Sequence, residues 1–117
     1  MNKISFDDFK KVDIRIGTVI KAEVPSWSHW VIKLTADLGP GIGEKICFSG
    51  VMKFFEPGSF VGKQFPFVVN LEPKKIGPDK EFSEVMMIMA CPGGEDNDVA
   101  PVLFKLQKKV PNGTKVF

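Results

Sequence analysis

Residues 13–24, DIRIGTVIKAEV, contain the strongest secondary-structure signal in the chain. Positions 14, 16, 18 and 20 hold three isoleucines and a threonine, and the positions between them hold Arg15, Gly17, Val19 and Lys21. Alternation of this kind among β-branched residues predicts a β-strand and not a helix. Because Gly17 falls in mid-strand, we also expect a bulge or a sharp bend there, as at a barrel corner.

Short elements separated by Gly/Pro turns flank this strand. Ser5, followed three residues later by Asp8, is close to a capping box and predicts a helix over residues 6–11, with Phe6 and Phe9 on one face. We expect further strands at 30–37, 44–49, 64–70, 83–90 and 102–104, turns at 38–43 and 110–114, and a basic loop at 72–80. Pro66 predicts either an unpaired ladder position or an edge strand.

Length and composition agree with many short elements. The chain has 117 residues, a size typical of one domain spanning 1–117, and 11 Gly and 9 Pro disfavour long helices. We therefore expect an all-β fold: a five-stranded OB-type barrel with a short N-terminal helix and a C-terminal extension. Periodicity alone leaves an SH3-like barrel open as the alternative.

Residue counts exclude several function classes. Lys and Arg number 16 against 14 Asp and Glu, which excludes a globally basic chain but not a local basic patch. The one histidine, His29, and two distant cysteines, Cys47 and Cys91, suggest no metal or catalytic constellation, and both cysteines are interpreted as small buried hydrophobes. No apolar run is long enough to span a membrane and no signal-peptide pattern is visible, so we expect a cytoplasmic protein with no cofactor and no membrane insertion.

A binding function fits the residues better than catalysis. The sequence holds no GxSxG, P-loop or GxGxxG motif. RNA binding requires cations on one surface, and unpaired bases require flat aromatic faces. Lys53, Lys74 and Lys75 meet the first requirement, and the chain carries 11 Phe and 2 Trp for the second. On an OB-type barrel this combination indicates oligonucleotide binding.

Six segments form a specific set by their order in the chain: DFKKVDIRIGTVIKAE, IKLTADLGPGIGEK, FSGVMKFFEP, GKQFPFVVNLEPKKIG, SEVMMIMA and VPNGTKV. The set resembles the tRNA-binding-domain family, whose OB-fold module is also attached to some methionyl- and phenylalanyl-tRNA synthetases. Within that family the chain looks most like the CsaA branch of stand-alone export chaperones, through LGPGIGEK, NLEPKKI, SEV and VPNGTKV. The resemblance covers residues 6–116.

The resemblance implies a non-enzymatic, homodimeric tRNA-binding protein with a basic groove on the barrel face. Its partner would be tRNA or another structured RNA, recognised by shape and backbone. The family's RNA-facing positions correspond to Ser49, Lys53, Asn70, Lys74, Lys75, Ser83 and Met86. The dimer interface of CsaA-like proteins corresponds to Phe6, Phe9, Phe104, Val110 and Phe117.

The same resemblance implies an alternative function, which is to hold unfolded preproteins for the export machinery. In CsaA-like proteins an apolar pocket beside the dimer interface is thought to hold the client. Here we expect that pocket around Trp27, Trp30, Phe48 and Phe54. Two tryptophans stand in PSWSHW where the family usually has smaller or charged residues, which favours an apolar partner. A module that docks onto a larger complex is a third alternative.

Overall fold

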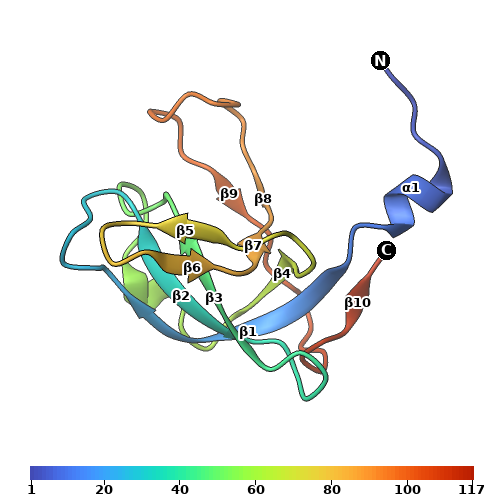
Figure 1. The fold of residues 1–117 in the computed structure, drawn as a ribbon, viewed down its shortest axis with the longest axis horizontal. Helices are drawn as coiled ribbons and strands as arrows, with labels where there is room; N and C mark the ends of the chain where they lie inside the picture. The colour runs from blue at the N-terminus through green and yellow to red at the C-terminus, as the bar shows by residue number, and fades with distance from the viewer.

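A long first strand organises the fold (Figure 1). The computed structural model describes residues 1–117. Strand β1 (Ile14–Glu23) pairs antiparallel with β4 (Gln64–Val68) through its first half and with β2 (Ile32–Asp37) through its second half. Next to β2 lies β3 (Glu44–Ser49), and next to β4 lies β7 (Met86–Met87), so the strand order is β3-β2-β1-β4-β7.

Hydrogen bonds between the two ends of this sheet close it nearly into a barrel. The N–H groups of Glu84 and Val85, just before β7, donate to the carbonyl of Ile46 on β3 at 2.8 and 3.3 Å. The N–H of Ile46 donates in turn to the Glu84 carboxylate at 3.1 Å. The observed fold is therefore mostly β, a nearly closed five-stranded antiparallel barrel, and it confirms the expected fold class.

The remaining elements surround this barrel. They are α1 (Phe6–Lys10), η1 (Pro57–Ser59), β5 (Lys74–Ile76), β6 (Glu81–Ser83), β8 (Met89–Ala90), β9 (Val102–Leu103) and β10 (Lys115–Val116). Strands β5 and β6 form one hairpin, β8 and β9 form a second, and β10 pairs with the start of β1. Figure 1 shows α1 and the β8–β9 hairpin standing out from the barrel. No helix of the structure has the length and apolar character to cross a membrane.

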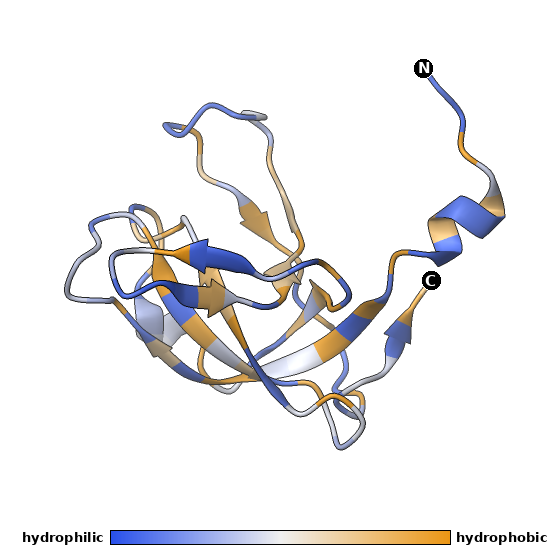
Figure 2. Cartoon of the chain, in the orientation of Figure 1, coloured by the Kyte–Doolittle hydropathy of each residue, from blue (hydrophilic) through white to orange (hydrophobic).

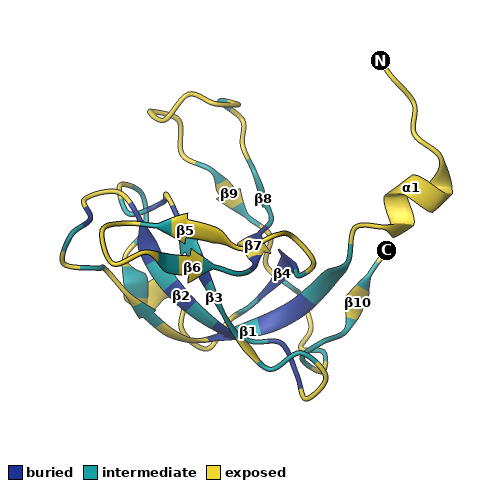
Figure 3. Cartoon of the chain, in the orientation of Figure 1, coloured by how far each residue is buried: buried dark blue, intermediate teal, exposed yellow.

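Large apolar side chains from the barrel strands and their connections fill the interior. Phe60, Phe65 and Phe67 have no exposed surface. The Phe60 ring centroid lies 5.7 Å from that of Phe55 and 5.8 Å from that of Phe65. Figure 3 shows that buried residues concentrate on the barrel strands, whereas α1 is exposed along its length. Part of the phenylalanine content therefore forms the core, and the rest lies at the surface.

We expected the bulge in β1 at Gly17, but it lies further along the strand. The register with β2 shifts between Val19 and Lys21, so that Val19 is buried and Ile20 is exposed. Gly17 meets a different requirement, close approach of the chain: a Cβ atom there would lie 2.7 Å from Cδ2 of Leu38. The strand assignment is confirmed, and the position of its irregularity was wrong.

One loop prediction and one strand prediction were wrong in the second half of the chain. The expected loop at 72–80 contains β5, which is paired with β6. The single strand expected at 83–90 is divided among the end of β6, β7 and β8. The division has a physical reason, because the backbone of Glu84 and Val85 leaves the β5–β6 hairpin to bond with β3 and close the barrel.

Pro66 lies in an inner strand of the sheet and not at an edge. It stands opposite Ile16 of β1, whose N–H donates to the carbonyl of Thr114 at 2.9 Å and not to β4. The Pro66 carbonyl accepts from the N–H of Ile88 at 3.0 Å, on the side of β4 that faces β7. Of the two predicted alternatives, the unpaired ladder position is therefore the one observed, and it lies on the β7 side where that ladder ends.

The helix prediction is confirmed to within one residue. The Ser5 side chain caps α1 by accepting from the N–H of Asp8 at 3.0 Å. The rings of Phe6 and Phe9 lie on one face, with centroids 6.4 Å apart. None of the residues of α1 is buried, so the helix contributes an exposed aromatic face.

The two cysteines occupy different environments. Cys47 on β3 is buried, as predicted, and desolvation raises the pKa of its thiol to about 11. Cys91 is exposed, which corrects the expectation that both are buried. The reason is positional: Cys91 follows β8 directly, where the chain leaves the barrel for the β8–β9 hairpin loop.

The buried thiol makes stability depend on pH. In the unfolded chain Cys47 ionises near its ordinary pKa of 9.0, whereas the folded barrel holds the proton until about 11. Between these values the unfolded state releases the proton first, so we expect rising pH to destabilise the fold by about 3 kcal/mol in total. Urea unfolding of wild type and Cys47→Ala between about pH 8 and 11 checks this. Equal pH slopes for the two proteins would contradict it.

Candidate nucleic-acid interface

The β5–β6 hairpin presents cations and an aromatic ring on the outer surface of the barrel. Lys74 and Lys75 are exposed on β5, opposite Ser83 and Phe82 on β6. The ammonium of Lys75 lies 5.8 Å from the centroid of the Phe82 ring, which is 48% exposed. Figure 2 shows β5 as a hydrophilic strand on this face. The hairpin therefore offers positive charge beside an accessible π-face.

A hollow of about 560 Å³ lies beside this hairpin. Four of the residues predicted from the sequence meet there, namely Phe48, Lys74, Ser83 and Met86. The rest of its lining is Leu71, Glu72, Ile76, Glu84 and Val85. Two carboxylates and five apolar side chains surround one lysine, so the hollow itself is apolar to acidic. The positive charge comes from Lys74 in the lining and Lys75 next to it on β5, and we call these two lysines the rim. The β5–β6 hairpin and the hollow together are called the hairpin face.

Glu72 and Glu84 were missed by the sequence reasoning. Glu84 is held by the N–H of Ile46 at 3.1 Å, and one of its oxygens lies 3.7 Å from the ammonium of Lys45. No sequence pattern singled these carboxylates out, because their placement follows from barrel closure. They show that an anion would not enter the hollow as readily as an uncharged group.

Lys53 does not line this hollow, and its ammonium already forms an ion pair with an acidic side chain. Its ammonium lies 2.5 Å from the Asp98 carboxylate, and both side chains are exposed. The hydrogen bond from Lys53 lowers the pKa of Asp98. A phosphate that bound Lys53 would have to displace the carboxylate of the β8–β9 loop.

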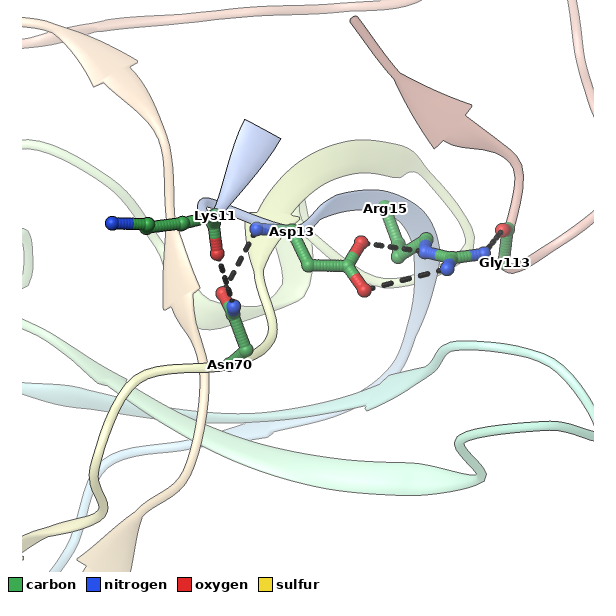
Figure 4. Close-up of polar contacts among 5 residues, drawn as sticks. All are labelled: Lys11, Asp13, Arg15, Asn70 and Gly113. Atoms are coloured by element: carbon green, nitrogen blue, oxygen red, sulfur yellow. Dashed lines mark hydrogen bonds and ion pairs between the residues drawn. The ribbon is translucent and has the colours of Figure 1, made fainter. Parts of the chain in front are cut away.

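Asn70 fastens the start of β1 to the end of β4, as Figure 4 shows. Its Oδ1 accepts from the N–H of Asp13 at 2.9 Å, and its Nδ2 donates to the carbonyl of Lys11 at 2.6 Å. Arg15 extends the arrangement, because it bonds to the Asp13 carboxylate at 2.7 Å and donates to the carbonyl of Gly113 at 3.1 Å. The bond from Arg15 lowers the pKa of Asp13. The Asn70 amide therefore stabilises the fold through these backbone hydrogen bonds.

Three of the four predicted peptide-binding aromatics lie together. The Trp27 ring lies 6.3 Å from that of Trp30 and 6.1 Å from that of Phe48. Trp27 also covers Gly77, where a Cβ atom would come within 2.4 Å of its ring. Trp30 is 59% exposed. Because Phe48 also lines the hollow, the cluster adjoins the hairpin face.

Phe54 and Ser49 do not join these groups. Phe54 forms no ring pair with the tryptophans and lies under the Lys53 ammonium, 5.7 Å from it. Ser49 is buried at the end of β3, opposite Ile32. Neither side chain lines the hollow of the hairpin face.

Four of the five predicted dimer residues are exposed. Phe6 and Phe117 are 67% and 85% exposed, and Phe9 and Phe104 are also open to solvent. Val110 is half-buried, and its backbone N–H and carbonyl are both bonded to the Gln64 side chain. A set of exposed aromatic rings therefore lies at the two ends of the chain.

Solved structures match this fold over the whole chain. A MetRS-related protein from Pyrococcus horikoshii matches with a TM-score of 0.86, at 33% identity and with full coverage of both chains. The chaperone CsaA from Bacillus anthracis matches with a TM-score of 0.84, at 32% identity, over 99% of this chain and 100% of that one. A CsaA chaperone protein from Picrophilus torridus matches with a TM-score of 0.82, at 26% identity, over 98% and 100% of the two chains.

Curated sequences add methionine–tRNA ligases. Methionine–tRNA ligase 1 of Bacillus anthracis is 34% identical over 114 residues, which are 97% of this chain and 16% of the ligase. The ligase of Methanothrix thermoacetophila is 36% identical over 110 residues, 94% of this chain and 15% of that protein. The chain thus spans a sixth or less of the length of these ligases. No protein-family model matches the sequence.

The nearly closed five-stranded barrel with a rimmed hollow on one face defines an OB-fold binding domain. The chain belongs to the family of OB-fold tRNA-binding-domain proteins that includes the CsaA chaperones and the MetRS-related protein. The resemblance and the non-enzymatic class that were predicted from the sequence are thereby confirmed.

Proposed function

We propose that this protein binds tRNA through the hairpin face. The observation that carries the proposal is the pair Lys74 and Lys75 on β5, which lies beside the half-exposed ring of Phe82 and the half-exposed side chain of Met86. Lysines attract phosphates as point charges, and open π-faces stack bases that leave a helix. The name of the related ligases supports tRNA as the RNA, and binding to tRNA carries with it a cytoplasmic site of action.

The two kinds of surface on the hairpin face divide the work. Glu72 and Glu84 repel phosphate from the hollow, so the RNA backbone follows the lysines on the rim. An uncharged group, such as an unpaired base, suits the apolar part of the hollow against Phe48 and Met86. Recognition then depends on RNA shape and on unstacked nucleotides, which is the usual mode for structured RNA.

Titration of labelled tRNA at several salt concentrations tests this function. We expect affinity to fall steadily with salt, and the two or three phosphate contacts of the hairpin face should contribute about −2 to the logarithmic slope. A duplex RNA without loops is the control, and it should bind more weakly because it offers no unpaired base. Absence of tRNA binding at about 50 mM salt would overturn the proposal.

The homodimer is part of the same proposal. Two subunits would present two hairpin faces to one RNA, and the exposed rings of Phe6, Phe9, Phe104 and Phe117 supply apolar surface for a partner. Aromatic side chains are enriched in the buried centres of interfaces. A second copy of the chain is the partner that the resemblance to CsaA favours.

Phe6→Ser/Phe9→Ser is expected to produce a monomer. Both rings lie on one face of α1, and α1 contributes no buried residue to the barrel, so their loss should remove interface without unfolding the core. Sedimentation velocity measures the change, and thermal unfolding checks the barrel. A wild type that sediments as a monomer, or a variant that remains dimeric, would contradict this interface.

One observation favours a second function, the holding of unfolded chains. Trp30 is 59% exposed beside Trp27, and Phe48 joins these rings to the apolar lining of the hollow. Exposed apolar surface with a polar rim suits segments of a non-native protein. The preproteins and export machinery expected for a CsaA-like protein would be the clients and partners.

Trp30→Ser is expected to reduce suppression of aggregation. The change removes the most exposed ring of the cluster and leaves Trp27 packed over Gly77. Light scattering of an aggregating client with equimolar protein measures the effect. Val61→Ser, which removes an exposed apolar side chain elsewhere, is the matched control. If wild type leaves aggregation unchanged, the holding function is refuted; if both variants act alike, the Trp30 surface is not the site.

A further inference from the structure

A second hollow, of about 350 Å³, carries only positive charge. It lies between the turn that leads into β4 and the segment between β9 and β10. Its lining is Gly62, Lys63, Gln64, Lys105, Leu106 and Lys109. Three lysines and no carboxylate line it, in contrast to the hairpin face, where two carboxylates accompany one lysine. We call it the lysine hollow.

The charge of the lysine hollow is not neutralised within the chain. Lys63, Lys105, Lys108 and Lys109 form no ion pair, whereas Lys10, Lys11, Lys21, Lys33, Lys45 and Lys53 each do. Residues 99–117 contain no Asp or Glu. Lysines that share one hollow repel one another in the free protein. An anion that bridges them relieves this repulsion.

The walls of the lysine hollow are held in place before any ligand arrives. The Gln64 amide donates to the carbonyl of Val110 at 2.7 Å and accepts from its N–H at 3.1 Å. It also lies 3.0 Å from the Asn112 side-chain oxygen. These two hydrogen bonds to Val110 anchor the segment that carries Lys105 and Lys109 to the start of β4. A fixed site loses less conformational entropy when it binds.

Apolar surface next to the hollow supports the lysine stems. An adjoining hollow shares Lys63 and Lys105 and is lined by Phe55, Phe65 and Leu103 among others. Long lysine stems commonly rest on such surface with the ammonium in water. Three lysines gathered at one hollow suit a ligand with several negative charges in a row.

We propose that Lys63, Lys105 and Lys109 form a second contact for the phosphate backbone of RNA, separate from the hairpin face. This inference rests on the proposed tRNA binding and extends it. Lysine ammonium groups carry no planar fork for reading a base, so the contact positions the RNA and does not select sequence. A structured RNA offers continuous phosphates, and an RNA that contacts both surfaces would have to reach across a protein of 41 × 37 × 31 Å.

Charge reversal at Lys105 and Lys109 tests this contact in the full chain. We expect Lys105→Glu/Lys109→Glu to weaken tRNA binding roughly tenfold or more near 0.1 M salt and to flatten the logarithmic salt slope by about 2. Lys3→Glu/Lys21→Glu carries the same change of net charge on exposed lysines outside the hollow and should have a smaller effect. Lys105→Arg/Lys109→Arg should bind as wild type does.

The outcomes separate this inference from the proposed function. If wild type does not bind tRNA, both fail. In a second outcome, wild type binds tRNA, Lys74→Glu/Lys75→Glu weakens binding, and Lys105→Glu/Lys109→Glu behaves like the Lys3→Glu/Lys21→Glu control. That result refutes the lysine hollow and leaves the hairpin face supported.

Lysine acetylation with and without tRNA, read by mass spectrometry at one protein concentration, provides a second measurement that needs no variant. We expect tRNA to protect Lys63, Lys105 and Lys109 and to leave Lys3 and Lys21 reactive. Equal labelling of the three lysines in both states would overturn the proposal. Low acetylation of the three lysines in the sample without RNA would also overturn it, because another part of the protein assembly would then cover them.

Discussion

Lys74→Glu/Lys75→Glu is expected to weaken tRNA binding by roughly 100-fold near 0.1 M salt. The change removes two cations from the rim of the hairpin face and places two further carboxylates beside Glu72 and Glu84. Each lost phosphate contact should lower the logarithmic salt slope by nearly one unit, so the slope should fall by about 2. Both lysines are exposed on a surface hairpin, so the barrel should remain folded.

Filter binding over a salt series measures both quantities. Lys74→Arg/Lys75→Arg keeps the charge and should bind tRNA nearly as wild type does. Phe82→Leu separates the aromatic contribution, since loss of base stacking should cost about 1–3 kcal/mol with the salt slope unchanged. Unchanged affinity and slope in the charge-reversed variant would remove the hairpin face from the RNA interface.

Phe60→Ala is expected to lower the free energy of unfolding by about 3–5 kcal/mol. The Phe60 ring is fully buried and lies against the rings of Phe55 and Phe65, so its removal leaves a cavity in the core. A domain of this size has only about 5–15 kcal/mol of net stability, so one such cavity removes a large part of it. The variant should unfold at much lower urea concentration or fail to fold at growth temperature.

Urea unfolding followed by tryptophan fluorescence checks this value. Phe82→Ala is the matched control, because it removes the same ring from a half-exposed position and should cost far less. Phe60→Leu should fall between wild type and Phe60→Ala, because it leaves a smaller cavity. A loss for Phe60→Ala no greater than that for Phe82→Ala would contradict the core described here.

Local patterns predicted the elements whose residues interact mainly with near neighbours. The alternation at 14–21 predicted β1, and Ser5 with Asp8 predicted the cap of α1, because both signals act over a few residues. The turn at 38–43 was likewise predicted from its glycines, and Gly39 adopts a φ of +89° there. The same glycine also touches the turn at 110–114, since a Cβ atom on it would lie 2.4 Å from the Asn112 carbonyl oxygen.

The strands after residue 70 show why the rest could not be predicted. The mostly apolar run from Ser83 to Ala90 was predicted as one strand, yet Glu84 and Val85 bond to Ile46, far away in the sequence, and divide it. Barrel closure decides this pairing, and no local pattern contains it. The bulge beyond Gly17 has the same kind of cause, because the register of β1 depends on its partner β2.

The candidate site divides in the same way. The structure brings Lys74, Lys75, Ser83 and Met86 to one surface, because they lie on or beside a single hairpin. That this surface binds RNA stays a prediction. Asn70 and Lys53 were identified by position alone, and the structure shows them bonded to Asp13 and Asp98. The lysine hollow was not predicted, because Lys63 and Lys105 come together only when the segment before β10 packs against the start of β4.

By itself, the sequence determined the fold class, the family and the chemistry available to it: a small barrel with aromatic and lysine side chains to spare. These properties follow from composition and from contacts within a few residues. Only the tertiary structure decided which lysines are already paired, which rings are buried and where free positive charge gathers. The reason is that pairing, burial and charge all depend on residues distant in the chain, and barrel closure sets which of them meet.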